Sequence, residues 1–109
     1  MSINAFLPLG NTVAFTANVA APSAVQAVAT GLGTSQYEIF NAGNVTVFLG
    51  YGANATVANT QATVVTSTGP GYPLLAGTDK IISASPNAYF TGITASGNAT
   101  IYVTPGEGL

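Results

Sequence analysis

Residues 36–52 read QYEIFNAGNVTVFLGYG, two β-rich runs on either side of an Ala42-Gly43-Asn44 turn. Val, Ile, Phe, Tyr and Thr fit a pleated surface because their branched or flat side chains pack against cross-strand neighbours. Glycine supplies the positive φ that a short turn usually needs, and asparagine tolerates the same region. The pattern predicts a β-hairpin over this stretch.

A second copy of the pattern lies near the C-terminus. The segment GNVTVFL at 43–49 aligns with GNATIYV at 97–103, which predicts a second hairpin over 88–104. In each copy one strand face is apolar, and the opposite face carries threonine beside an aromatic residue, Phe48 or Tyr102. An aromatic residue on that face indicates either a second buried layer or a contact with another subunit.

The rest of the chain also reads as β-structure. Alternation over 11–19 predicts a half-buried strand whose apolar face ends at Val19. Further strands are expected over 24–30, 62–66, 74–79 and 80–85, with Gly and Pro turns between them. About eight short antiparallel strands at such spacing are typical of a sandwich or a barrel. We expect an all-β, single-domain β-sandwich, jelly-roll-like, over residues 11–109, preceded by an N-terminal extended arm over residues 1–10.

Charge is the abnormal feature of the composition. The 109 residues include one basic residue, three acidic residues and no histidine, so 4% are charged, against about 25% in ordinary domains. Interface cores are depleted in charge, so the composition indicates a protein that works in an assembly. A single basic residue argues against nucleic acid and against anionic membranes as partners. No apolar run approaches the roughly 20 residues of a membrane-spanning helix.

The sequence predicts no enzyme and no catalytic, cofactor-binding or metal-binding residue. General acid–base catalysis needs a histidine or two carboxyl groups with separated pKa values. Only Glu38, Asp79 and Glu107 are available; they lie far apart in the sequence and could pair only if the fold brought them together. Asp79 and Lys80 are interpreted as a surface ion pair.

Four segments resemble small β-rich virion structural proteins of tailed bacteriophages: NAGNVTVFLGYG at 41–52, PLLAGT at 73–78, SPNAY at 85–89 and ITASGNATIYVTPGEG at 93–108. The resemblance covers about the last two-thirds of the chain and rests on Gly, Thr and apolar patterns, without catalytic signatures. It implies a head decoration or cement protein, which binds the outside of the phage head and stabilises contacts between shell subunits.

Composition and resemblance together give one hypothesis. The chain is expected to be made in the bacterial host cytoplasm and to sit on the capsid surface of the virion as a homotrimer. Its partners are the major capsid protein of the same virus and itself, with no cofactor, nucleic acid or membrane. The expected contact residues are Ile3, Phe6 and Leu7 in the arm, together with Phe48 and Tyr102.

Two other functions stay open from the sequence. One is a tail, spike or fibre-associated virion component, which would share this composition. The other is a carbohydrate-binding β-sandwich module, in which some of the five tyrosines would stack on sugars. No spacing in the sequence singles out a sugar site.

Overall fold

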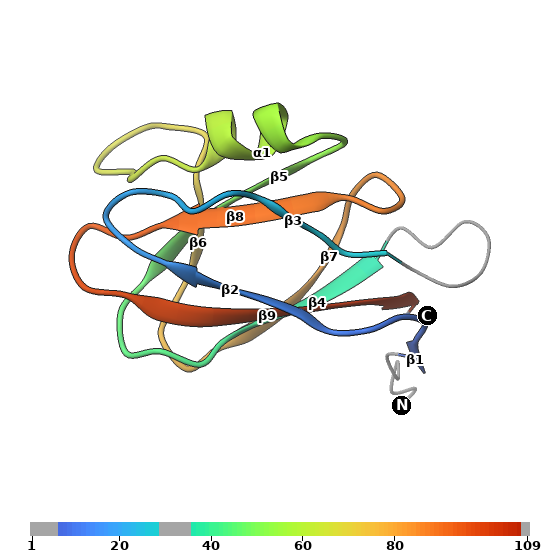
Figure 1. Ribbon diagram of the computed structural model, residues 1–109. Coiled ribbons are helices and arrows are strands. Elements are labelled where there is room, and N and C mark those ends of the chain that lie inside the picture. The colour runs from blue at the N-terminus through green and yellow to red at the C-terminus, as the bar shows by residue number, and fades with distance from the viewer. Residues whose placement is uncertain (1–6, 29–35, 108–109) are drawn as a thin grey trace.

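The computed structural model describes residues 7–28 and 36–107, which form nine strands and one short helix (Figure 1). In chain order these elements are β1 (Leu7–Pro8), β2 (Val13–Ala17), β3 (Val25–Gln26), β4 (Gln36–Asn41), β5 (Val47–Gly52), α1 (Ala55–Gln61), β6 (Tyr72–Leu74), β7 (Asp79–Ser83), β8 (Tyr89–Ile93) and β9 (Ala99–Glu107).

The strands form two antiparallel sheets packed face to face. One sheet has the order β2-β9-β4-β7, with β1 added beside the far end of β9, and the other has the order β3-β8-β5-β6. This is the strand order of a jelly roll, in which successive strands mostly alternate between the sheets. The expected all-β jelly-roll sandwich is therefore confirmed.

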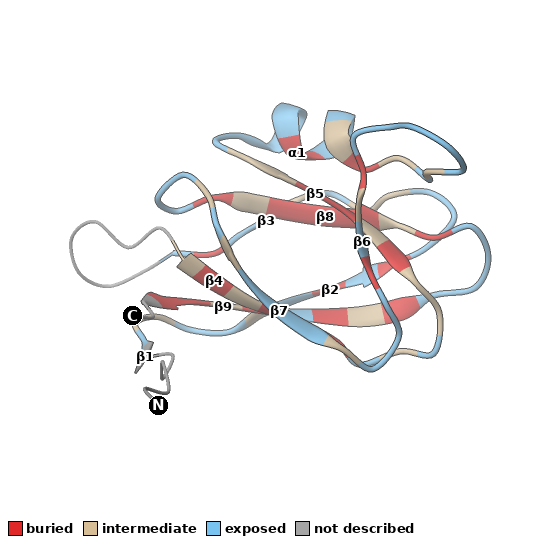
Figure 2. Ribbon diagram, turned by 180° about the vertical axis from the view of Figure 1, so that it is seen from behind, coloured by how far each residue is buried: buried red, intermediate tan, exposed pale blue. Residues whose placement is uncertain are grey.

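The core lies between the two sheets and is built from alternate residues of the long strands (Figure 2). Tyr37 and Ile39 of β4 point inward, as do Val47 and Leu49 of β5, and all four are fully buried. The Tyr37 ring meets the Phe90 ring edge to face, with centroids 4.9 Å apart. The predicted period-two alternation thus holds in both halves of the 36–52 stretch.

The predicted hairpin over 36–52 is wrong, because β4 and β5 lie in different sheets. β4 pairs with β7 and β9, whereas β5 pairs with β6 and β8. The chain between them crosses from one sheet to the other as an arch. Asn41 holds this arch: its amide nitrogen donates to the carbonyl oxygens of Val45 at 2.9 Å and Leu74 at 3.0 Å, and its amide oxygen accepts from the Gly43 N–H at 2.9 Å.

The predicted second hairpin over 88–104 is wrong in the same way. β8 belongs to the four-stranded sheet and β9 to the five-stranded sheet. The sequence repeat is nevertheless a structural repeat, because both copies are arches and the aligned strands β5 and β9 occupy central positions in opposite sheets. Val47 and Leu49 of one copy and Ile101 and Val103 of the other are equally buried.

Several smaller expectations are corrected as well. Residues 62–66 form no strand; instead α1 precedes them, capped by the Asn54 side chain, which accepts from the Val57 N–H at 2.9 Å. This cap satisfies a free N–H at the start of the helix. β2 ends at Ala17, so Val19 lies beyond the strand and is 59% exposed. The short β3 lies within the predicted 24–30 strand, of which residues 29 and 30 fall outside the described range.

Gly50 makes room for α1 on the outside of β5. A Cβ on Gly50 would lie 2.0 Å from the Ala58 carbonyl oxygen and 2.6 Å from the Ala62 nitrogen, both backbone atoms that cannot swing aside. Gly50→Ala should therefore lower the free energy of unfolding in urea by about 3 kcal/mol, as overpacking does. Gly69→Ala is the control, since its Cβ would meet only side-chain atoms, the Val65 Cγ2 at 3.3 Å and the Thr63 Oγ1 at 3.7 Å. Equal losses in the two variants would contradict this account of α1 packing.

Candidate functional site

The outer face of the five-stranded sheet is the most distinctive surface of the molecule. We call the exposed apolar part of it the docking face, formed by Phe40 of β4, Ile81 of β7 and Tyr102 of β9. Phe40 and Tyr102 are direct cross-strand partners, each 42% exposed, and Ile81 is 48% exposed. Helix α1 lies over the other sheet, and no described element covers the docking face (Figure 1).

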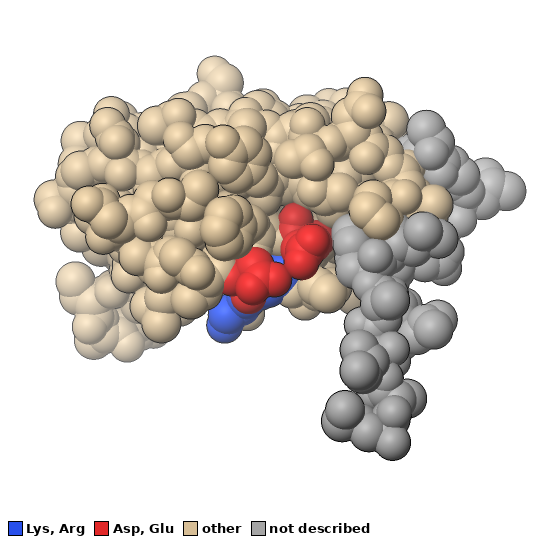
Figure 3. Space-filling model, turned by 90° about the horizontal axis from the view of Figure 1, so that it is seen from below, with Lys and Arg blue, Asp and Glu red and all other residues tan. Residues whose placement is uncertain are grey.

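Two carboxyl groups border the docking face. Asp79 is the cross-strand partner of Phe40, and Glu38 is the partner of Ile81. Figure 3, seen from below, shows the acidic atoms gathered in one place beside the blue atoms of Lys80, the only basic residue of the chain. The rest of the described surface in that view is uncharged. The face is therefore apolar with one acidic corner.

Burial raises the pKa of Glu38 above its ordinary value of 4.5, and a hydrogen bond with the Asp79 carboxyl group and repulsion from its charge raise it further. The two carboxyl groups that lie far apart in the sequence thus meet across β4 and β7. The predicted ion pair between Asp79 and Lys80 is not found among the described residues. The Lys80 ammonium instead lies 5.0 Å above the ring centroid of Tyr72, a cation–π contact.

Three of the four charged residues can also be explained by the structure of the sheet alone. β7 is an edge strand of its sheet, and Asp79 and Lys80 lie on it while Glu38 lies on its neighbour. Charged side chains on an edge strand prevent another chain from adding to the sheet, so these residues also keep the β7 edge free.

Glu38→Gln should change how stability depends on pH. Because the pKa of Glu38 is raised on folding, the folded state binds more protons than the unfolded state above pH 4.5. The stability linked to Glu38 is thus fully present below its ordinary pKa and is lost as the pH rises through the raised value. Melting temperatures from about pH 3 to 7 should fall more in the wild type than in the variant, which should be the more stable one at neutral pH. Parallel profiles would contradict the proposed environment of Glu38.

The structure separates the two aromatic residues that the sequence placed on equivalent faces. Tyr102 lies on the open docking face. Phe48 is half-buried on the outside of the other sheet, where the chain after α1 covers it; a Cβ on Gly71 would lie 3.0 Å from the Phe48 Cβ. Of the two alternatives left open by the sequence, the second buried layer holds at Phe48. Tyr102 is exposed, so a contact of its side chain with another subunit stays a prediction.

The predicted arm contacts are only partly described. The backbone of Leu7 pairs with Glu107 as part of β1, and the Leu9 N–H donates to the Pro105 carbonyl oxygen at 2.9 Å. Ile3 and Phe6 lie outside the described residues.

Sequence reasoning missed Phe40 and Ile81 as surface residues. The signal for Phe40 was present, because Tyr37 and Ile39 alternate inward and so place Phe40 outward with Glu38. The adjacent Ile81 and Ile82 gave no such signal, since either could face the core. Pairing of β7 with β4 decides the matter by placing Ile81 opposite Glu38.

The tyrosines do not form a common platform. Tyr37 is fully buried, and its hydroxyl donates to the Ser85 carbonyl oxygen and accepts from the Ala88 N–H. The other tyrosines besides Tyr102 are at least half-buried. Phe40 and Tyr102 are the aromatic pair that the fold presents together.

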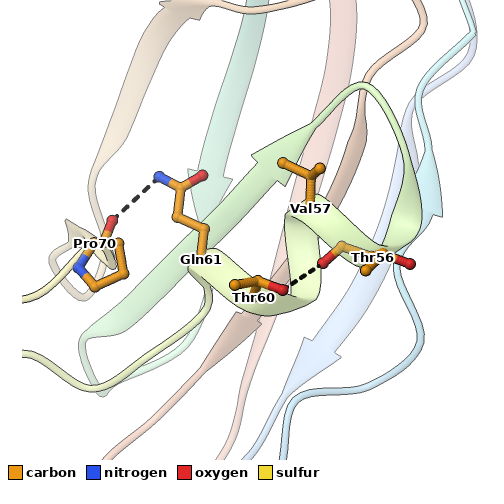
Figure 4. A pocket seen from close by; sticks show the side chains of 5 residues that line it. All are labelled: Thr56, Val57, Thr60, Gln61 and Pro70. Atoms are coloured by element: carbon orange, nitrogen blue, oxygen red, sulfur yellow. Dashed lines mark hydrogen bonds between the residues drawn. The ribbon is translucent and has the colours of Figure 1, made fainter.

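A hollow of about 310 Å³ lies between α1 and Pro70 (Figure 4). Gln61 spans it: its amide nitrogen donates to the Pro70 carbonyl oxygen at 3.2 Å, and its amide oxygen accepts from the Tyr51 N–H at 3.1 Å. The Thr60 hydroxyl donates to the Thr56 carbonyl oxygen at 2.8 Å. Because these polar groups form hydrogen bonds within the chain, the hollow offers a ligand mainly the Val57 side chain, which is 48% exposed.

Within the described ranges, no three His, Cys, Asp or Glu side chains gather as a metal site. None of the helices described there is long and apolar enough to span a membrane. Comparison with protein-family models, with curated proteins and with solved structures found no match.

Proposed function

We propose that this chain is a structural virion protein of the head decoration or cement type, and that its docking face binds the outside of the phage head. The observation that carries the proposal is the cross-strand pair Phe40 and Tyr102, exposed beside Ile81 on a sheet face that no described element covers. Exposed apolar patches mark interaction surfaces, and aromatic residues dominate the binding energy of many interfaces.

The charge distribution supports a protein partner. The molecule has a surface of 5698 Å² and four ionisable acidic or basic residues, which leaves most of that surface neutral. A neutral surface with exposed aromatic residues matches the composition of interface cores. On a symmetric shell, many copies make the same modest contact, and symmetry multiplies its effect.

The fold and the sequence resemblance support the proposal in different ways. Jelly rolls occur in viral capsid domains and also in lectins, so the fold suits a capsid role but does not select it. The resemblance to small virion proteins of tailed phages favours the capsid role. In this role the chain binds and clamps, and no catalytic step is proposed.

Carbohydrate binding is the second candidate, because Phe40 and Tyr102 present two rings side by side that could stack on a sugar. A sugar site also needs polar groups that fix the orientation of the ligand. The carboxyl groups of Glu38 and Asp79 lie beside the pair on the same face of the sheet. A change in tyrosine fluorescence on adding glycans to the purified chain would favour this function.

Co-sedimentation with shells of the virus that encodes the chain tests the proposal. The purified protein should bind saturably, at a fixed number of copies per shell, and raise the temperature at which the shells fall apart. Binding to tails instead of heads would move the protein to the tail or spike class. No binding to either would overturn the virion assignment.

We further propose a trimer as the form that binds the shell. Light scattering behind size exclusion should then give a mass about three times the 10.8 kDa of the chain. Self-association would cover part of the neutral surface and present three docking faces at once, which raises avidity. A monomer mass over the whole concentration range would contradict the free trimer.

A further inference from the structure

The acidic corner of the docking face restricts what can cover it; this inference rests on the proposed function and deepens it. Glu38 is half-buried and Asp79 is exposed, and they lie on adjacent strands on the same outer face as Phe40. The groups that face Glu38 across the sheet are Ile81 and Asp79 on β7, and Thr104 with its neighbour Tyr102 on β9. None of these groups is cationic. Lys80 lies beside the corner (Figure 3), but its ammonium is over the Tyr72 ring, and among the described residues it forms no ion pair with either carboxyl group.

A partner that covers Phe40 and Tyr102 also removes water from these carboxyl groups. Burying a carboxylate without a hydrogen-bonded partner of opposite charge is strongly unfavourable. The covering surface must therefore neutralise the corner or leave it with a large desolvation penalty.

A second copy of this chain does not supply the missing charge. Its only basic residue is Lys80, whose ammonium lies over the Tyr72 ring of its own chain. Two copies meeting through this same face would bring two acidic corners into one interface, and like charges placed together are unfavourable. Charge complementarity thus points to a different protein.

We infer that the partner surface is apolar opposite Phe40, Tyr102 and Ile81 and carries an arginine or lysine side chain opposite Glu38 and Asp79. Arginine fits best, because its planar guanidinium can donate to both carboxyl groups at once. Any trimer of the chain would then form through a different surface and leave the docking face for the shell.

The double variant Glu38→Gln/Asp79→Asn distinguishes a basic partner from an apolar one by the sign of its effect. Against a basic side chain, the neutral amides lose the charge pair and leave a buried cation unpaired, so binding weakens. Against a purely apolar surface, the same change removes two carboxylates that are costly to desolvate, so binding tightens.

The probe is a random peptide library displayed on particles, selected on the immobilised full-length chain and depleted on Tyr102→Ser. Selected peptides should contain an excess of Arg or Lys among apolar residues. Their affinity for Glu38→Gln/Asp79→Asn should be at most about one tenth of their affinity for the wild type, consistent with loss of a desolvated charge pair. Thermal unfolding of each variant confirms that it is folded.

Three results would overturn the inference: peptides without a basic excess, equal or tighter binding to the amide variant, or no peptide whose binding depends on Tyr102. The library reports partner chemistry without the virus, whereas shell binding tests the virion role. If the chain selects basic peptides but does not bind shells, the proposed function is refuted and the inference stands. If the amide variant binds shells more tightly than the wild type does, the inference is refuted and the proposed function stands.

Discussion

Replacing Phe40 and Tyr102 together by serine should weaken binding to shells by about 100-fold or more while leaving the fold intact. Truncation of a central aromatic residue in an interface commonly costs about 2 kcal/mol or more, and about 2.7 kcal/mol corresponds to 100-fold in affinity. Both side chains point away from the core and are 42% exposed in the free chain. The measurement is a binding isotherm by co-sedimentation.

The matched control is Val57→Ser/Leu75→Ser. It also removes two exposed apolar side chains, 48% and 59% exposed, but neither belongs to the docking face. Its affinity for shells should stay within about threefold of the wild type, as expected outside an interface hot spot. Equal loss of binding in the two double variants would mean that general surface hydrophobicity, and not the docking face, holds the protein on the shell.

Asn41→Ala should be the most destabilising single substitution of a polar residue in the chain. The side chain is fully buried and makes three hydrogen bonds that fix the arch between β4 and β5. Its removal leaves the carbonyl oxygens of Val45 and Leu74 without the donor they use here and opens a cavity. We expect a loss of about 3–5 kcal/mol in the free energy of unfolding, measured in urea.

Asn44→Ala in the same arch serves as the comparison. Asn44 is exposed, so its substitution should change the free energy of unfolding by about 0.5 kcal/mol or less. If Asn41→Ala were as mild as Asn44→Ala, the arch would not depend on the buried amide.

The fold class could be predicted from local alternation, because strands such as β2 and β4 show their buried faces in the sequence. The pairing of the strands could not. An Ala-Gly-Asn turn suits a hairpin and an arch equally well, and the choice depends on contacts from distant residues. Asn41 can hold the arch only because the Leu74 carbonyl oxygen lies within hydrogen-bond distance of its amide nitrogen. Gly43 is needed because a Cβ at this position would lie 2.3 Å from the Ala99 Cβ.

Local alternation predicted part of the candidate site, whereas the part that depends on contacts between distant residues could not be predicted. Alternation correctly placed Tyr102 on the outer face of its strand. The equivalent position of Phe48 gave the same signal, yet the chain after α1 covers it, and sequence reasoning did not anticipate that helix. The meeting of Glu38 with Asp79 depends on the pairing of β4 with β7, which no local pattern encodes.

Electron cryomicroscopy of particles of the encoding virus tests the central claim most directly. The account predicts density on the outside of the head into which this jelly roll fits, with Phe40, Ile81 and Tyr102 toward the shell and α1 facing away from it. A head surface without such density, or a jelly roll bound through its α1 side with the docking face open to solvent, would contradict the account.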